Sequence, residues 1–232
     1  MNPPSLLTAA EVTATHDRLL ASDGWPHRWP GEAEQDASDP RHWLYANHRF
    51  NSLLWAEEDL ARRTTVADAE IAANKRAIDG YNQARNDATE RVDELLLVAL
   101  GLVDEASARS DAPRSNVPEG PRLNSETAGS MIDRLSIMAL KIHAMRAQAQ
   151  RRDVDDGHRA ASAARLERLV QQRQDLAGCL DALLADAAAG RAHFKVYRQF
   201  KMYNDPRFNP ALVAERARQA LPAAGDGMGK EG

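Results

Sequence analysis

Three long stretches of the chain repeat their hydrophobic residues every three or four positions, which is the spacing of an amphipathic α-helix. These stretches are residues 45–63, 70–100 and 166–183. A charged residue interrupts the hydrophobic face of each one: Glu57 in the first, Arg85 in the second and Arg173 in the third. Burying a charge is costly unless it is paired or binds a ligand. The pattern therefore predicts that these three groups meet in the interior, as an ion network or as the site of a small anionic ligand.

Capping and helix-breaking residues predict where the helices begin and end. Thr8 and Glu11 have the spacing of a capping box, Pro40 suits the first turn of a helix, and Gly190 suits the position after a helix end. No segment shows the alternating pattern of a β-strand. The predicted helices are residues 9–21, 38–63, 68–102, 127–150 and 158–189.

These elements predict an all-α fold, an antiparallel bundle of four long helices with an extra N-terminal helix and a C-terminal aromatic segment. We expect one domain over residues 1–222 and a disordered tail over residues 223–232. The proline-containing segment 104–123 is predicted to be an exposed connector. The helix at 127–150 is apolar on two sides, which is typical of a central helix.

The composition and motifs exclude several classes of protein. A net charge of −4 gives no overall attraction to nucleic acid or to anionic lipid. A single cysteine, Cys179, excludes an intrachain disulfide framework and a cysteine-based zinc site, and it fits a reducing compartment. No histidine and carboxylate motif for a metal is present, and no run of about 18 apolar residues could span a membrane. We therefore expect a cytoplasmic protein with no metal, no cofactor and no membrane partner.

A second, polar stripe follows one helix beside the face that holds Glu57. Its members are spaced three or four residues apart: His48, Asn51, Trp55, Glu58 and Arg62. Glu58 and Arg62 could form a solvated surface pair. Alternatively, the two adjacent carboxylates in different surroundings could have separated pKa values and act as proton carriers, with His48 and Asn51 binding the substrate.

Arg85 and Arg173 carry planar guanidinium groups suited to binding carboxylate or phosphate. Asn82 lies one turn from Arg85 and could hydrogen-bond the same ligand. An internal bridge between Glu57 and the arginines is an equally open alternative.

The helix at 127–150 supplies two further candidates. Asp133 lies on its second apolar face and could orient the substrate. His143 lies on its first face and could carry a proton, although a single core histidine is more often structural.

The segment 193–203 alternates aromatic and cationic residues, including the candidate ligand Lys201. Aromatic and cationic groups together can stack bases or hold phosphates. The favoured alternative is an amphipathic segment that packs on the helices. We do not expect a nucleic-acid partner.

Six strings resemble a bacterial family catalogued as domain of unknown function four-two-five-four, over about residues 42–210. The strings are His48–Asn51, Leu54–Asp59, Lys75–Asp79, Asn82–Asp87, Glu126–Ile137 and Lys201–Pro206. The resemblance implies no established activity, but some members lie beside sugar-transfer genes. Where this chain has Ala128, relatives are expected to have proline. The polar motif positions coincide with candidates already identified: Asn51, Glu58, Asn82, Arg85 and Asp133.

We therefore expect a small-molecule enzyme or ligand-binding protein of a bacterial biosynthetic pathway for a sugar or specialised metabolite. It would hold an anionic substrate in a polar pocket and perform acid/base or group-transfer chemistry without a metal. The alternative is a non-catalytic adaptor or dimerising scaffold for a partner enzyme such as a glycosyltransferase. An accessible pocket containing Arg85, Asn82 and a carboxylate would favour the first, whereas sealed ion pairs would favour the second.

Overall fold

The computed structural model describes residues 6–28, 36–199 and 205–220. These residues form two compact units, divided between Tyr197 and Arg198. The first unit is built from long α-helices, so the all-α prediction is confirmed. Within the described residues, no helix is long and apolar enough to cross a membrane. The helices of the first unit are α1 (Ala9–Leu20), α2 (Pro40–Leu60), α3 (Asp68–Ala99), α4 (Ala128–Ala149) and α5 (Asp156–Ala188).

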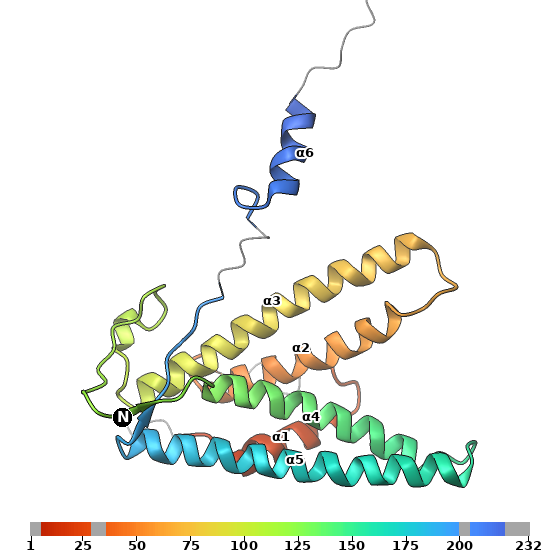
Figure 1. Cartoon of the computed structure of the whole chain (residues 1–232), viewed down its shortest axis with the longest axis horizontal. Coiled ribbons are helices and arrows are strands. Elements are labelled where there is room, and N and C mark those ends of the chain that lie inside the picture. The colour runs from red at the N-terminus through yellow and green to blue at the C-terminus, as the bar shows by residue number, and fades with distance from the viewer. Residues whose placement is uncertain (1–5, 29–35, 200–204, 221–232) are drawn as a thin grey trace, which may run out of the picture. The chain divides into compact units, whose positions relative to one another are not determined.

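The first unit consists of two helical hairpins and one shorter helix (Figure 1). α2 packs along α3, and α4 packs along α5, while α1 lies against α4 and α5. In Figure 1 the two hairpins diverge towards the right. Side chains near the hairpin tips therefore have fewer neighbouring helices to cover them than side chains near the crossing.

The helix boundaries follow from local capping, and each lies within three residues of its prediction. The Thr8 hydroxyl accepts a hydrogen bond from the Glu11 backbone amide at 3.2 Å and begins α1. Asp39 caps α2 in the same way. Gly190 follows α5 with a φ of 68°, a left-handed conformation that favours glycine.

Two short strands were not predicted. β1 (Arg122–Leu123) pairs in parallel with β2 (Ala192–His193), and this pairing ties the connector to the end of α5. The connector also contains a 3₁₀ helix, η1 (Glu105–Ser107). A two-residue strand is too short to show an alternating pattern, so no signal in the sequence could reveal it.

The second unit contains α6 (Pro210–Ala220), which was also missed. None of its residues is buried. Since an exposed helix needs no continuous hydrophobic face, periodicity gave no reason to expect it.

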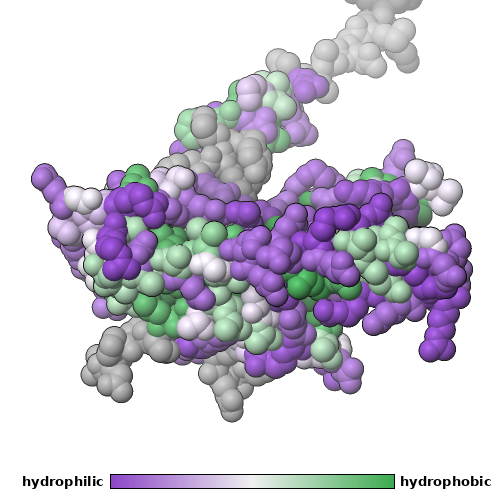
Figure 2. Space-filling model, turned by 60° about the horizontal axis from the view of Figure 1, so that its bottom comes forward, coloured by the Kyte–Doolittle hydropathy of each residue, from purple (hydrophilic) through white to green (hydrophobic). Residues whose placement is uncertain are grey.

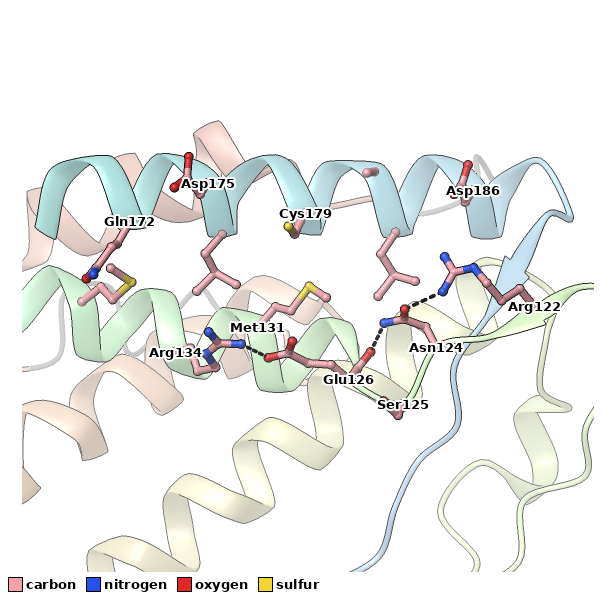
Figure 3. A pocket seen from close by; sticks show the side chains of 14 residues that line it. Arg122, Asn124, Ser125, Glu126, Met131, Arg134, Gln172, Asp175, Cys179 and Asp186 are labelled. Carbon is pink, nitrogen blue, oxygen red and sulfur yellow. Dashed lines mark hydrogen bonds and ion pairs between the residues drawn. The ribbon is translucent and has the colours of Figure 1, made fainter. Parts of the chain in front are cut away.

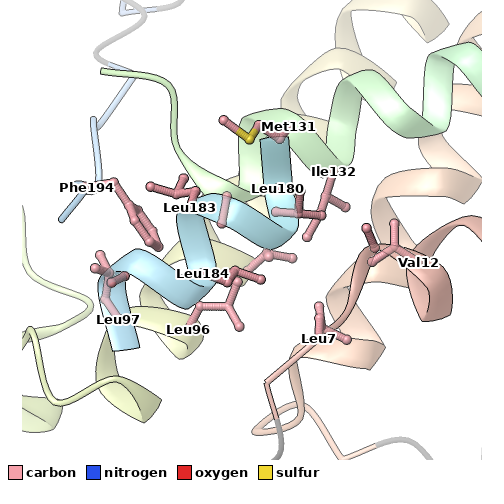
Figure 4. Packing of buried hydrophobic residues seen from close by; sticks show 14 of the residues in the cluster. Leu7, Val12, Leu96, Leu97, Met131, Ile132, Leu180, Leu183, Leu184 and Phe194 are labelled. Carbon is pink, nitrogen blue, oxygen red and sulfur yellow. The ribbon is translucent and has the colours of Figure 1, made fainter. Parts of the chain in front are cut away.

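The hydrophobic core lies where α1, α3, α4 and α5 converge, and Figure 4 shows its packing. Several leucines of α3 and α5 belong to it, including Leu96, Leu97, Leu180, Leu183 and Leu184. Phe194, just after β2, is 1% exposed and belongs to the same cluster. The next residue, Lys195, is exposed, as expected for a segment that packs on the helices. Residues 200–203 of the aromatic segment, including Lys201, lie outside the described residues, as does the predicted tail.

Polar residues cover much of the surface. Figure 2 shows one face, on which charged and polar side chains predominate and hydrophobic ones lie between them in recesses. On this face, polar groups therefore lie beside partly covered apolar side chains.

Candidate functional site

A polar cluster joins α2, α3 and α4 around one carboxylate oxygen. The Oδ1 atom of Asp133, on α4, accepts hydrogen bonds from the side-chain amides of Asn47 and Asn51, each at 2.8 Å. Both asparagines lie on α2. The Nε atom of Arg85, on α3, lies 3.8 Å from the same oxygen. Asp133 and Arg85 therefore face each other in a loose ion pair that the two amides hold in place.

The Arg85 guanidinium is only partly engaged by the protein. Its Nη2 atom donates a hydrogen bond to the Asn86 side-chain oxygen at 2.9 Å. Its Nε atom is buried and has no hydrogen-bond partner among the described residues. The side chain is 24% exposed. A cation fixed on two sides and open on a third is suited to binding an anion.

A pocket of about 330 Å³ lies beside this cluster, between α2, α3 and α4. This volume is in the range of small-molecule sites. It contains four of the residues predicted from the sequence, Asn51, Glu58, Asn82 and Arg85. Its other lining residues are Leu54, Trp55, Asp59, Arg62, Ile137 and Leu140. The pocket thus combines an apolar wall with charged and amide groups.

Asn82 and Glu58, which both line the pocket, differ in whether their side chains already have a partner within the protein. The side chain of Asn82 makes no hydrogen bond within the described residues, so its amide is available to a ligand. Glu58 forms a 3.1 Å ion pair with Arg62, with 47% and 69% of the two side chains exposed. Exposed pairs of this kind contribute little to stability, so a ligand could displace Arg62 at low cost.

Glu57 does not reach the arginines. Its carboxylate accepts a hydrogen bond from the Asn74 side-chain amide at 2.7 Å, and Asn74 in turn accepts one from Arg63 at 3.2 Å. These contacts lie towards the tip of the α2–α3 hairpin. Glu57 is half-buried and does not line the pocket.

Arg173 is covered, as its place on the hydrophobic face of α5 predicted, but it pairs with α1. It donates to both carboxylate oxygens of Asp17, at 2.9 and 3.0 Å, and to the Thr13 carbonyl at 2.8 Å. The prediction that Glu57, Arg85 and Arg173 meet is therefore wrong. Helical periodicity gives the direction of a side chain around its axis, but not the helix it will face.

The predicted placement of His143 on the buried face of α4 is also wrong, because its side chain is exposed. It lies beyond Ile142, towards the tip of the α4–α5 hairpin. There the two helices pack mainly on each other, so the other faces of α4 are open to solvent.

His48 lies behind the pocket and is fully buried, so it cannot bind a substrate there. Its Nδ1 atom is 2.8 Å from the Ser136 hydroxyl, and its ring stacks on His16 at 4.4 Å and on Trp25 at 5.4 Å between centroids. Burial, together with the nearby Arg173 cation, lowers the pKa of His48 to about 3. Burial likewise holds the pKa of His16 well below its usual value. Both imidazoles are therefore neutral packing groups.

Sequence reasoning missed Asn47 and Ser136. Both are buried, and both contact residues that were identified: Asn47 binds Asp133, and Ser136 lies 3.0 Å from the Asn51 amide. Asn47 precedes Asn51 by four residues, which places both amides on one face of α2. That spacing was the available signal for Asn47.

A larger groove, of about 860 Å³, runs between α4 and α5 (Figure 3). It contains none of the candidate residues. Several of its charged groups are already satisfied: Arg134 pairs with Glu126, Arg122 donates to Asn124, and Asp186 pairs with Arg191 at 2.7 Å. The smaller pocket is the better candidate because the Arg85 guanidinium is only partly paired and the Asn82 side chain has no hydrogen-bond partner among the described residues. Within the described residues, no group of three potential metal ligands occurs.

A protein-family model matches more than half of the chain. The model of the family described as "protein of unknown function (DUF4254)" matches residues 41–196, so the chain belongs to that family. This match confirms the resemblance noted from the six strings. No curated protein matches the chain, and no solved structure does.

Proposed function

We propose that this member of the DUF4254 family binds a small anionic molecule in the pocket between α2, α3 and α4. It would act in the cytoplasm as an enzyme or ligand-binding protein of a bacterial biosynthetic pathway. In this proposal, helices α2 to α5 form one antiparallel bundle around the ligand. The observation that carries the proposal is the partly exposed Arg85 guanidinium beside the Asn82 amide in a pocket of about 330 Å³. Burial strengthens the attraction between such a cation and a bound carboxylate or phosphate.

Each pocket residue has a distinct role in this proposal. Arg85 binds the anionic group, and Asn82 hydrogen-bonds it or a neighbouring polar group. Asp133 orients Arg85 from behind. Glu58 is the candidate proton carrier that lines the pocket, so a proton transfer is assigned to it rather than to Glu57 or His143.

The proposal is tested by thermal shift with a library of phosphorylated sugars, nucleotides and carboxylic acids. A true ligand should raise the melting temperature of the wild-type protein, and the shift should disappear in Arg85→Ala. Arg76→Ala is the matched control, because Arg76 is an exposed arginine on the same helix that does not line the pocket. Ligands whose shift survives Arg85→Ala but not Arg76→Ala would contradict the assigned site.

Catalysis is tested separately from binding. A ligand found in this way is incubated with wild-type protein and with Glu58→Gln, and its conversion is followed by NMR. We expect Glu58→Gln to bind the ligand but not to convert it. Conversion at the wild-type rate would remove Glu58 from the mechanism.

The alternative, an adaptor or dimerising scaffold for a partner enzyme such as a glycosyltransferase, is supported by two exposed apolar side chains on α2. Trp55 and Leu60 are 36% and 40% exposed. Exposed apolar groups beside a concavity are typical of protein interfaces. Light scattering tests self-association: a dimer that Leu60→Asp dissociates would favour the scaffold, whereas a monomer at all concentrations would count against the homodimer.

A further inference from the structure

We infer that the pocket selects an anion carrying a hydrogen-bond donor, a hydroxyl or ammonium group, beside its charged group, and that Asn51 makes the selection. The ligand class is thus a hydroxylated or aminated carboxylate or phosphate ester. This inference rests on the proposed function, because it assigns Arg85 to the anionic group.

The orientation of the Asn51 amide follows from its neighbours. Its Nδ2 atom lies 2.8 Å from Asp133 Oδ1, 3.0 Å from Ser136 Oγ and 3.2 Å from Asn47 Oδ1. A carboxylate and an amide oxygen can only accept hydrogen bonds. Turning the amide over would place its oxygen against those two oxygens, so the NH₂ group must face them.

The same contacts determine what Asn51 presents to the ligand. Both hydrogens of its NH₂ group are used within the protein, whereas its Oδ1 atom has no partner among the described residues. Asn51 is only 4% exposed, yet it lines the pocket. The group it offers there is therefore an acceptor.

This acceptor lies next to the group that binds the anion. Asn51 Nδ2 and Arg85 Nε are 2.8 and 3.8 Å from the same oxygen of Asp133. A ligand anchored on Arg85 would therefore carry its neighbouring substituent to Asn51. An apolar substituent would cover the Asn51 oxygen and leave it without a partner, which a nearly buried acceptor tolerates poorly.

The test compares probes that differ in one hydroxyl group, using the full chain. Lactate is paired with propionate, and propane-1,2-diol 1-phosphate with propyl phosphate, and the Kd of each is measured by NMR titration. The two pairs distinguish a carboxylate from a phosphate as the anionic group. In at least one pair, the hydroxylated member should bind roughly tenfold more tightly or better, and binding should be lost in Arg85→Ala.

Two variants show which residue makes the selection. Asn51→Ala should abolish the difference within the pair. Asn47→Ala is the matched control, because Asn47 donates to the same Asp133 oxygen at the same 2.8 Å but does not line the pocket. It should weaken both probes and preserve their ratio. Circular dichroism establishes whether the variants fold. If Asn51→Ala does not fold, the ratio of the two Kd values in the wild-type protein still tests the inference.

The outcomes separate this inference from the proposed function. Equal binding of both members of each pair, lost in Arg85→Ala, would overturn the selection and leave the anion site intact. A ratio that Asn51→Ala preserves would overturn the role of Asn51. Absence of any Arg85-dependent binding by the four probes would contradict both proposals.

Discussion

The carboxylate of Asp93, on α3, accepts a hydrogen bond from the backbone amide of Gly129, in the first turn of α4, with 2.6 Å between Oδ1 and the nitrogen. A side chain of one hairpin thus satisfies an amide at a helix start in the other, where the helix dipole favours negative charge. Burial nevertheless raises the pKa of Asp93 to about 7, against the opposing effect of hydrogen bonds from Thr127 and Gly129. The contact is both tightly packed and sensitive to pH.

Gly129→Ala should destabilise the protein. A β-carbon at this position would lie 2.5 Å from the Thr89 carbonyl oxygen and 2.9 Å from Asp93 Oδ1. The carbonyl belongs to the backbone of α3 and cannot turn away, so we expect a loss of about 1–3 kcal/mol in the free energy of unfolding, or more. Urea denaturation measures it.

Gly178→Ala is the matched control for that prediction. A β-carbon there meets nothing within 4 Å, in the middle of α5. Alanine favours a helix over glycine by up to about 1 kcal/mol, so this variant should be as stable as the wild type or more so. Destabilisation of both variants to the same degree would show that close packing at Gly129 is not the cause.

Asp93→Asn should change how stability depends on pH. The pKa of Asp93 is about 7 in the folded protein, compared with a reference value of 3.8. Between these values the folded state holds a proton that the unfolded state has released, so the Asp93 contribution to the free energy of unfolding decreases as pH rises. The slope approaches roughly 1.4 kcal/mol per pH unit at most. Relative to the wild type, Asp93→Asn should gain stability from pH 4 to pH 7. If the free energies of unfolding from urea denaturation changed in parallel with pH in the two proteins, this prediction would be contradicted.

His48→Asn should reduce the loss of stability in acid. The pKa of His48 is about 3 in the folded protein against a reference value of 6.5, because burial disfavours the cation. Between these values the unfolded state binds a proton that the folded state excludes, so stability decreases as pH falls from 6.5 towards 3. The variant should be less stable at pH 7, where stacking on His16 and Trp25 is lost, but its stability should change less between pH 6.5 and 4.

The control for His48 is His143→Asn, which replaces an exposed imidazole on α4. Its denaturation curves should follow those of the wild type. If His48→Asn retained the full acid-induced loss of stability, the buried imidazole would not be its source.

Arg173→Met should weaken the attachment of α1 without affecting the pocket. The variant loses the hydrogen bonds to Asp17 and to the Thr13 carbonyl, and it leaves the Asp17 carboxylate without its cationic partner. We expect a loss of about 1–3 kcal/mol, measured by denaturation. A ligand identified through Arg85 should bind the variant as it binds the wild type. Loss of binding in a folded Arg173→Met protein would restore Arg173 to the site.

The sequence predicted the long helices well because their ends depend on local chemistry. Thr8 and Asp39 accept hydrogen bonds from amides two or three residues away, so their capping roles need no distant partner. β1 and β2 were missed because their pairing joins segments about seventy residues apart, and neither has a pattern of its own.

The candidate site was predicted in part. Asn82 and Arg85 were found because a spacing of three residues places them on one face of α3, and they line the same pocket. Glu57 shares its face of α2 with apolar residues, but the structure pairs it with Asn74 instead of an arginine. A helical face predicts that a polar side chain needs a partner, and it does not identify the partner.

The sequence by itself determined the helices, their apolar faces and the polar residues that interrupt them, because these follow from hydrogen bonds and spacings within a few residues. Only the tertiary structure decided that Asp133 lies between α2 and Arg85, and that Arg173 faces α1. Such pairings depend on how far each hairpin extends and where the hairpins cross. Those quantities are set by packing among all the helices at once, and no short stretch of the chain contains them.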